Sequence, residues 1–388
     1  MPALRPLRVL IAGGGTGGHL YPGIALAEEI TATGGEVLFV GTARGLESKL
    51  VPEAGFALEL MDVSGLKRTG VRGLVRGLAL LPRAFARSRT LLRIFRPDLV
   101  VGVGGYASGP LVFVAALSGY PTVIQEQNSR PGLTNRILGR LARRVFVAFS
   151  EARRSFSKRK LRLFGNPVRR RFLERVAAGE GAMPGAARPP ASEPSLLVLG
   201  GSQGSHAINE VASSMVQVLK ARGILPRVVH QTGPGEIDRM MLYYEALGLS
   251  ERVEARAYID DMPAALAGAS LVVARAGALT LAELAIMGRP AVLIPLPTAA
   301  DDHQVLNALE FQRAGAAVVV PEYGTTPPQF ANVVQTLLAD PARLAKMSEA
   351  MRALARPNAT REIVAELRTL VEGRRGHARA PDVDAERA

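Results

Sequence analysis

Short runs of β-branched residues alternate with longer helical patterns along the whole chain, and this alternation limits the possible folds more than any other feature. Strands that alternate with helices form parallel sheets whose faces are covered by helices. The runs come in two sets of five, separated by a segment at 176–194 that is rich in Ala, Gly and Pro. The expected strands are Arg8–Ala12, Glu36–Gly41, Asp98–Val103, Pro121–Gln125 and Arg144–Ala148, then Ser195–Leu199, Arg227–Gln231, Val253–Ala257, Ser270–Ala274 and Ala291–Pro295.

The two sets of strands predict two Rossmann-like domains of α/β class. With 388 residues the chain exceeds what one hydrophobic core usually supports. We place the first domain at 1–165 and the second at 166–372, with a final helix at about 357–372 that could pack back on the first domain. Residues 373–388 mix charge with Ala and Pro, so we expect a disordered tail. Parallel sheets bind ligands beyond the carboxyl ends of their strands, which predicts one cleft between two facing domains.

The net charge of +14 indicates a negatively charged partner, although a solvated arginine-rich surface is the plain alternative. Aromatic residues make up 5% of the chain and Trp is absent, which counts against a stacking platform for single-stranded nucleic acid. The chain has no Cys, which excludes disulfides and thiolate metal sites. No apolar run reaches the roughly 18–20 residues that span a bilayer, and we see no signal-peptide pattern. Any membrane contact is therefore expected at the surface.

One stretch, from Leu66 to Phe95, concentrates the positive charge. Between Lys67 and Arg96 there are nine cations and no Asp or Glu, interleaved with Leu, Val, Ile and Phe. An amphipathic helix with an apolar stripe and a basic flank fits the surface of an anionic membrane. The alternative is an ordinary Rossmann-type helix with a solvated arginine face.

Three glycine-rich turns follow expected strands, at Gly13–Gly18, Gly104–Gly109 and Gly200–Gly204. Glycines let the backbone approach a phosphate or a sugar, and a helix N-terminus favours negative charge. Each turn alone could be an ordinary βα connection, but three of them predict a binding site. Gly13, Gly15 and Gly18 also fit a dinucleotide-binding pattern. That pattern needs an acid at the end of the second strand, where the chain reads Phe39-Val40-Gly41-Thr42, so we do not expect NAD.

Five polar positions are candidates for chemistry. His19 opens the first helix, and since histidine titrates near pH 6.5 it suits a general base, or else it is a local cap. Glu283, one turn into a helix, could bind a ribose diol or could only stabilise the helix dipole. Asp301, Asp302 and His303 are consecutive and cannot all converge on one ion, so we expect sugar contacts and helix capping there, and no metal.

The motifs together resemble the MurG family of glycosyltransferases, over about Arg8 to Leu370. The motifs that carry the resemblance are Gly13–His19 with Tyr21-Pro22-Gly23, Gly104–Pro110, Glu126-Gln127-Asn128, Gly165–Arg169, Gly200–Gly204, Arg275–Glu283, His303-Gln304 and Asn307-Ala308. The resemblance implies the GT-B fold, with two Rossmann-like domains facing across a cleft, the acceptor on the first and the donor mainly on the second.

The resemblance also implies the reaction. UDP-GlcNAc would donate GlcNAc to the C4 hydroxyl of MurNAc in lipid I, giving lipid II for peptidoglycan, with inversion and without metal or cofactor. The enzyme would be peripheral, on the cytoplasmic face of the cell membrane, with an anionic membrane as partner and no nucleic acid. The basic and apolar stretch from Leu66 to Phe95 would match the family's membrane patch.

The family's site residues carry over to matching positions of this chain. His19 would be the general base, Ile259 would face uracil and Glu283 the ribose, while Tyr106 and Glu126 would lie on the acceptor side. The implied UDP-GlcNAc contacts are Thr16, Gly17, Gly18, Asn128, Arg169, Ser202, Ile259, Ala278, Leu279, Thr280, Leu281, Ala282, Glu283 and Gln304. Some relatives have two Gln where this chain has His303-Gln304, which leaves open which side chain meets the sugar. The 177–194 insertion has no counterpart that we can place.

Three alternatives remain at the sequence level. A GT-B enzyme with another lipid or natural-product acceptor would share the donor site. A UDP-GlcNAc 2-epimerase would share the fold but would turn over without an acceptor. A basic nucleic-acid-binding protein would explain the charge and would ignore UDP-GlcNAc.

Overall fold

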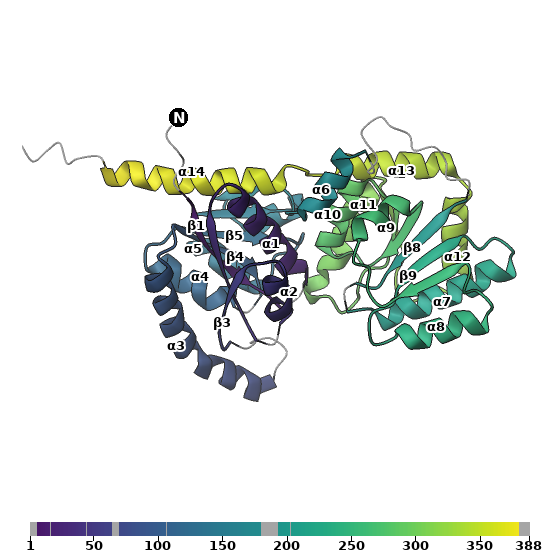
Figure 1. The fold of residues 1–388 in the computed structure, drawn as a ribbon, viewed down its shortest axis with the longest axis horizontal. Coiled ribbons are helices and arrows are strands. Elements are labelled where there is room, and N and C mark those ends of the chain that lie inside the picture. Colours follow the sequence, from purple (N-terminus) through teal and green to yellow (C-terminus); the bar gives the residue numbers. More distant parts are fainter. Residues whose placement is uncertain are drawn as a thin grey trace, which may run out of the picture. The chain divides into compact units, whose positions relative to one another are not determined.

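The computed structural model describes residues 6–15, 17–43, 45–63, 70–105, 107–179, 193–201 and 203–379 (Figure 1). The chain divides into two compact units. The N-terminal unit holds residues 1–127, 131–167 and 358–388, and the C-terminal unit holds 128–130 and 168–357. The chain therefore returns to the N-terminal unit after completing the other one.

The N-terminal unit is built on a parallel sheet with the strand order β3-β2-β1-β4-β5-β6-β7. β1 lies between β2 and β4, with Val9 beside Val37 on one edge and Leu99 on the other. The strands are β1 Arg8–Gly13, β2 Glu36–Gly41, β3 Ala57–Leu60, β4 Leu99–Gly104, β5 Thr122–Glu126, β6 Arg144–Val147 and β7 Leu161–Leu163. The helices are α1 Gly17–Ala32, α2 Glu47–Glu53, α3 Gly70–Phe95, α4 Ser108–Leu117, α5 Leu133–Leu141, η1 Ser150–Ser155 and α14 Ala359–Arg379.

Both faces of this sheet are buried, as a parallel sheet requires. Side chains alternate along a strand, so Val9 and Ile11 of β1 join one core with apolar residues of α1, α2 and α14. Leu10 and Ala12 join the other core, with residues of α3, α4 and α5. Helices on both faces thereby fix the direction in which each strand end points.

Helix α14, which comes from the C-terminal end of the sequence, completes the N-terminal unit. It packs on α1 and contributes Ile363, Val364 and Leu367 to the core around β1. Glu366 adds an ion pair at 2.7 Å with Arg144 of β6. The helix continues through Arg379, so the expectation of a disordered tail from residue 373 is wrong for 373–379. Arg, Gly, His and Ala fill that stretch, and Pro381 is the first residue that would stop a helix. Residues 380–388 lie outside the described residues.

The C-terminal unit repeats the architecture with a parallel sheet of order β10-β9-β8-β11-β12-β13. Its strands are β8 Ser195–Leu199, β9 Arg227–Gln231, β10 Val253–Arg256, β11 Leu271–Ala274, β12 Ala291–Leu293 and β13 Ala317–Val319. Its helices are α6 Arg170–Ala177, α7 His206–Ala221, α8 Ile237–Ala246, α9 Met262–Gly268, α10 Ala278–Met287, η2 Ala300–Asp302, α11 His303–Arg313, α12 Pro327–Leu338 and α13 Pro341–Ala353.

Each sheet reverses its strand order at one point, between β1 and β4 and between β8 and β11. Ligands of open α/β sheets bind where the order reverses, beyond the carboxyl ends of the strands. Most of the insertion at 177–194 lies outside the described residues. Among the described helices, none has both the length and the apolar character to cross a membrane.

Candidate active site

The glycine-rich motifs follow the strands that flank the two reversal points. In the N-terminal unit, Gly14 and Gly15 follow β1, while β4 ends at Gly104 and runs into Gly105. In the C-terminal unit, Gly200 and Gly201 follow β8, and the segment from Arg275 follows β11. The motifs found in the sequence therefore lie at the position in each sheet where an α/β fold places its ligand.

The two N-terminal turns touch each other through bare backbone. A Cβ atom on Gly105 would lie 2.3 Å from the carbonyl oxygen of Gly14, and one on Gly13 would lie 2.9 Å from that of Gly104. No side chain fits at either contact, and Gly105 has a φ of 83° that favours glycine. Glycine is thus required for the two turns to pack together.

A buried carboxylate, that of Glu47 in α2, holds the first turn. It accepts hydrogen bonds from the backbone N–H of Gly15 at 2.8 Å, and from the N–H and hydroxyl of Thr42 at 2.8 and 2.7 Å. Burial alone would raise the pKa of Glu47, but these hydrogen bonds outweigh burial and lower it. Glu47 lies in the helix that follows β2 and not at the end of the strand, where the dinucleotide-binding pattern has its acid. Its oxygens bind the turn itself rather than a ribose.

His19 lies in the first turn of α1, with its Nδ1 atom 2.9 Å from Oε1 of Gln127. Gln127 follows β5, is buried, and donates from Nε2 to the backbone carbonyls of Val103 and Gln125. The histidine therefore contacts a side chain that is remote in sequence. Gly17 and Gly18 begin the same helix. Thr16 and Tyr106, two other predicted site residues, lie outside the described residues.

Glu126 is buried at the end of β5 and faces protein groups. Its carboxylate accepts hydrogen bonds from Nδ2 of Asn135 at 2.8 Å and from the N–H of Gly132 at 3.3 Å. These contacts fix the start of α5, because Gly132 is the residue before that helix. The side chain is 1% exposed, so its part on the acceptor side stays a prediction.

In the C-terminal unit, the amide of Gln231 connects two predicted donor-site segments. Nε2 donates to the carbonyl oxygen of Gly201 at 2.8 Å, and Oε1 accepts from the N–H of Ile259 at 3.2 Å. Gln231 ends β9, and its side chain is buried. It thereby joins the glycine-rich turn to the residue expected to face uracil. Ser202, in that turn, lies outside the described residues.

Two predicted nucleotide contacts, Arg169 and Glu283, form a buried ion pair. Nη2 and Nε of Arg169 lie 2.6 and 3.1 Å from the same oxygen, Oε1 of Glu283. Burial raises the pKa of Glu283, and the Arg169 guanidinium opposes that rise. Glu283 lies in α10, whose first residues Ala278, Leu279 and Thr280 carry the N-terminal amides. Two residues lie between Thr280 and Glu283. Leu281 is fully buried and could reach a ligand only through its backbone, while Ala282 is half-buried.

The side chain of Asn307 in α11 forms hydrogen bonds with two further segments of the C-terminal unit. Its Nδ2 donates to Oδ1 of Asn128 at 3.3 Å and to the carbonyl of Ala276, and its Oδ1 accepts from the N–H of Ser129. Asn128, a predicted sugar contact, is thereby placed beside the strand-to-helix turn before α10. Asn307 was part of a motif but had no predicted role.

Gln304, in the first turn of α11, accepts a hydrogen bond at Oε1 from the N–H of Leu296 at 3.0 Å. Asp301 and Asp302, just before the helix, adopt left-handed φ angles of 56° and 54°. Asp302 is the N-cap position but makes no side-chain capping hydrogen bond, so the capping prediction is wrong for it. Within the described ranges, no three His, Cys, Asp or Glu side chains are grouped so that they could hold a metal ion.

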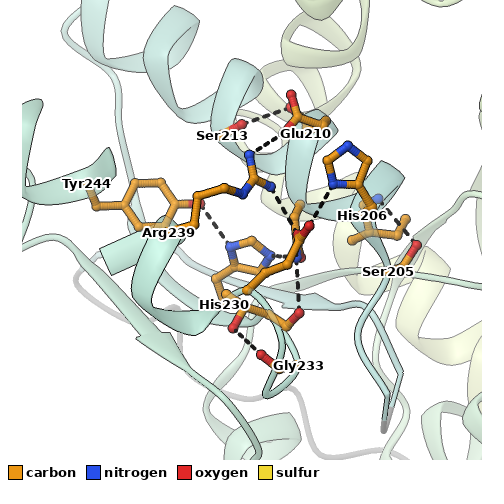
Figure 2. A network of polar contacts seen from close by, with 12 residues as sticks. Ser205, His206, Glu210, Ser213, His230, Gly233, Arg239 and Tyr244 are labelled. Carbon is orange, nitrogen blue, oxygen red and sulfur yellow. Dashed lines mark hydrogen bonds and ion pairs between the residues drawn. The ribbon is translucent and has the colours of Figure 1, made fainter. Parts of the chain in front are cut away.

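A polar network supports the loop after β9 (Figure 2). His230 is fully buried, with Nδ1 2.8 Å from the hydroxyl of Tyr244 and Nε2 3.1 Å from Oδ1 of Asn209. Glu236 hydrogen-bonds Asn209, His206 and Arg239. Burial lowers the pKa of His230 to about 4. Burial opposes the shift at Glu236, but its hydrogen bonds lower its pKa to about 2.

Both units match models of known glycosyltransferase domains. Residues 9–147 match the N-terminal domain of glycosyltransferase family 28, and residues 195–363 match its C-terminal domain. The chain belongs to this family, and the predicted α/β class and GT-B fold are confirmed.

Individual relatives narrow the similarity further. A protein of Anaeromyxobacter sp. (strain Fw109-5) is 48% identical over 373 residues, which cover 95% of this chain and 95% of the relative. One of Myxococcus xanthus (strain DK1622) is 44% identical and covers 98% of both chains. Both are named UDP-N-acetylglucosamine–N-acetylmuramyl-(pentapeptide) pyrophosphoryl-undecaprenol N-acetylglucosamine transferase. The crystal structure of Acinetobacter baumannii MurG is 28% identical, with a TM-score of 0.73 over 94% of this chain and all of that one. The resemblance to the MurG family is therefore confirmed.

Proposed function

We propose that this chain transfers GlcNAc from UDP-GlcNAc to the C4 hydroxyl of MurNAc in lipid I, giving lipid II for peptidoglycan. The observation that carries the proposal is the near-full-length identity to relatives named for this reaction. Residues 1–165 would form the domain that binds the acceptor and the membrane. Residues 166–372 would form the domain that binds the donor, except for the final helix, which packs on the first domain. The geometry of each unit supports this division of labour.

The donor would bind to the C-terminal unit. The hydrogen bonds from Nε and Nη2 of Arg169 both end on Oε1 of Glu283, so Oε2 is the oxygen we assign to the ribose diol. Ile259 would face uracil, and the N-terminal amides of α10 would hold the diphosphate. Because Oε1 of Gln304 already accepts from Leu296, its Nε2 would donate to the sugar. Asn128, Ser202 and the run from Ala278 to Ala282 complete the proposed set.

The reaction itself would be a single displacement with inversion at the anomeric carbon. The acceptor C4 oxygen would bond to C1 of GlcNAc as the bond from C1 to the diphosphate oxygen breaks. His19 would take the hydroxyl proton, a form of assistance typically worth about 10²–10⁴ in rate. Backbone amides and the α10 N-terminus would stabilise the charge that develops on UDP. Thr16, Gly17, Gly18, Tyr106 and Glu126 would lie near the reacting groups.

We also propose that the enzyme docks on the cytoplasmic face of the cell membrane through the stretch Leu66–Phe95. Residues 64–69, and the side chains of 70–78, lie outside the described residues. In the rest of α3, Arg83, Arg89 and Arg93 are exposed. Leu91, Leu92 and Phe95, which the sequence suggested as part of a membrane stripe, instead pack in the sheet core.

Exposed apolar side chains near α3 can supply the apolar contact that this stripe cannot. Ile94 of α3 is 73% exposed, Leu117 at the end of α4 is 68% exposed, and Ile137 of α5 is 50% exposed. α3 packs on α4 and α4 on α5, so the three residues belong to adjacent helices. Basic residues beside exposed apolar ones favour an anionic interface.

The decisive experiment is incubation of the purified protein with labelled UDP-GlcNAc and a lipid I analogue. We expect a disaccharide lipid to form. Label transferred only to other lipid acceptors would instead support another GT-B transferase. Conversion of UDP-GlcNAc without any acceptor would support a 2-epimerase, and salt-sensitive DNA binding with indifference to UDP-GlcNAc would support a nucleic-acid-binding protein.

A further inference from the structure

The buried amide of Gln127 has two ends in different surroundings. Nε2 lies 2.8 Å from the carbonyl oxygen of Val103 and 3.2 Å from that of Gln125, whereas Oε1 lies 2.9 Å from Nδ1 of His19. Carbonyl oxygens only accept hydrogen bonds, so the amide nitrogen must face them. The reverse orientation would bring three oxygens together around a side chain that is 1% exposed. The network therefore fixes which end of the amide meets His19.

The amide oxygen of Gln127 can only accept, so neutral His19 must carry its hydrogen on Nδ1. Its lone pair is then on Nε2, since the partner of one ring nitrogen sets the state of the other. We propose that Gln127 is a positioning residue that holds His19 in the Nδ1–H tautomer and thereby presents Nε2 as the base for the acceptor hydroxyl. The role of Nε2 rests on the proposed function, whereas the tautomer does not.

The position of the imidazole is fixed by the neighbouring turn as well. A Cβ atom on Gly104 would lie 2.8 Å from Nδ1 and 3.0 Å from Cε1 of His19. The ring therefore lies over bare backbone at the end of β4, where Gly104 has a φ of 101°. Gln127 is anchored to the carbonyls of β4 and β5, so α1, β4 and β5 together determine the direction of the ring.

Gln127 differs from the carboxylate that orients histidine in many catalytic sites because it carries no charge. A neutral partner sets the tautomer and the ring orientation but adds little stabilisation to the imidazolium. We therefore expect its removal to cost less than loss of the base itself, about 10- to 100-fold in kcat, against the 10²-fold or more expected for His19→Ala.

The tautomer can be measured without any turnover, by ¹⁵N NMR of histidine-labelled protein above the pH at which the imidazoles protonate. The His19→Ala variant identifies the His19 signals. His230 serves as an internal reference: Nδ2 of Asn209 donates to the carbonyl of Thr232 and to Glu236, so its Oδ1 accepts from Nε2 of His230. We expect Nδ1–H for His19 and Nε2–H for His230. An Nε2–H signal for His19 would overturn the inference.

Variants separate positioning from folding. Gln127→Met should give His19 a mixture of tautomers and lower kcat about 10- to 100-fold, with the KM for UDP-GlcNAc within about 3-fold. Gln127→Glu keeps an acceptor for Nδ1–H, but its second oxygen faces the carbonyls of Val103 and Gln125 and must be protonated to donate to one of them. As a neutral acid it should keep the tautomer and recover kcat relative to Met, with the acid limb of the pH–rate profile unmoved.

Gln125→Met is the matched control. Gln125 is equally buried and donates from Nε2 to a backbone carbonyl, that of Gly165, at 3.3 Å, but its side chain does not contact His19. We expect it to leave both the tautomer and kcat unchanged. Equal losses in the two Met variants would mean a merely structural role and would overturn the proposal. If the wild type makes no disaccharide lipid, the proposed function fails while the NMR result still decides the tautomer.

Discussion

Each of the three glycine-rich turns is held, at the scale of single residues, by a buried polar side chain from another element. Glu47 binds the turn after β1, Gln127 binds the carbonyl of Val103 before the turn after β4, and Gln231 binds the turn after β8. Glycine-rich backbone has little side-chain packing of its own and pays a large conformational entropy cost when ordered. These three side chains supply the hydrogen bonds that restrict it.

Glu47→Gln tests this restraint. A glutamine has one oxygen where the carboxylate has two, so its NH₂ group must face the N–H of Gly15 or of Thr42. A buried donor without a partner costs about 1–3 kcal/mol. We expect the melting temperature to fall by several degrees and kcat to fall about 10-fold, because the turn leads into His19. Glu53→Gln, on the exposed face of the same helix, should change neither quantity. Unchanged kcat in Glu47→Gln would separate the turn from catalysis.

Glu283 is best tested by Glu283→Gln, since removing the whole side chain would leave the guanidinium of Arg169 buried without its partner. We expect the KM for UDP-GlcNAc to rise on the order of 10-fold, with kcat at saturating donor within about 3-fold, as uniform binding predicts. Wild-type protein should bind UDP more tightly than 2′-deoxy-UDP by calorimetry, and the variant should lose this preference. A variant that still distinguishes the two nucleotides would exclude a ribose contact.

Among the elements, the central strands could be predicted, whereas three of the four edge strands could not, β10 being the exception. All ten expected strands are present, and Glu36–Gly41, Ser195–Leu199 and Arg227–Gln231 have the predicted bounds. β3, β7 and β13 were missed because they are only three or four residues long and partly exposed. Short edge strands lack the continuous apolar run that marks a strand buried on both faces.

The candidate site shows the same division between local and distant information. Glycines after a strand are visible in the sequence because a turn is a local structure. The partners Glu47 and Gln127 are not visible, since each contact depends on how remote segments come together. The buried face of α3 shows the opposite case, in which a pattern visible in the sequence led to a wrong prediction. Leu91, Leu92 and Phe95 fit a membrane stripe by spacing alone, but a helix that covers a sheet needs the same spacing.

The exposed face of α3 makes the membrane prediction testable at the scale of one element. We expect the triple variant in which Arg83, Arg89 and Arg93 are replaced by Glu to lose its binding to vesicles that contain anionic lipid. Each cation near such a surface contributes about 1 kcal/mol to the binding free energy. Sedimentation with vesicles measures this, and binding of the wild type should weaken as salt is raised. The triple variant Arg313, Arg343 and Lys346→Glu has the same change in charge on exposed positions of the C-terminal unit and should stay bound. Equal vesicle binding by both variants would refute docking through α3.

For the molecule as a whole, the net charge of +14 and the buried histidine network act together in acid. Protonation of carboxylates below neutral pH adds to a positive charge that already repels itself. The network in Figure 2 adds a specific contribution, because His230 and Glu236 both titrate at lower pH in the folded chain than in the unfolded one. For both groups the unfolded state binds more protons, so the stability of the fold decreases as the pH falls.

Two pH windows follow from these shifts. His230 would destabilise the fold progressively from pH 6.5 down to about 4, and Glu236 from pH 4.5 down to about 2. For the fully buried His230 the loss is on the order of 3 kcal/mol, a decrease in melting temperature of about 6–12 °C for a unit of this size. Thermal unfolding followed by circular dichroism between pH 7 and pH 3 measures the loss of stability in both windows.

Two variants assign each window to its residue. His230→Gln cannot titrate, so it should be less stable than wild type at pH 7, but its stability should no longer decrease between pH 6.5 and 4. Glu236→Gln should keep that decrease and lose much of the one below pH 4.5. If His230→Gln and wild type lose stability in parallel through the upper window, the buried imidazole is not the group that titrates there.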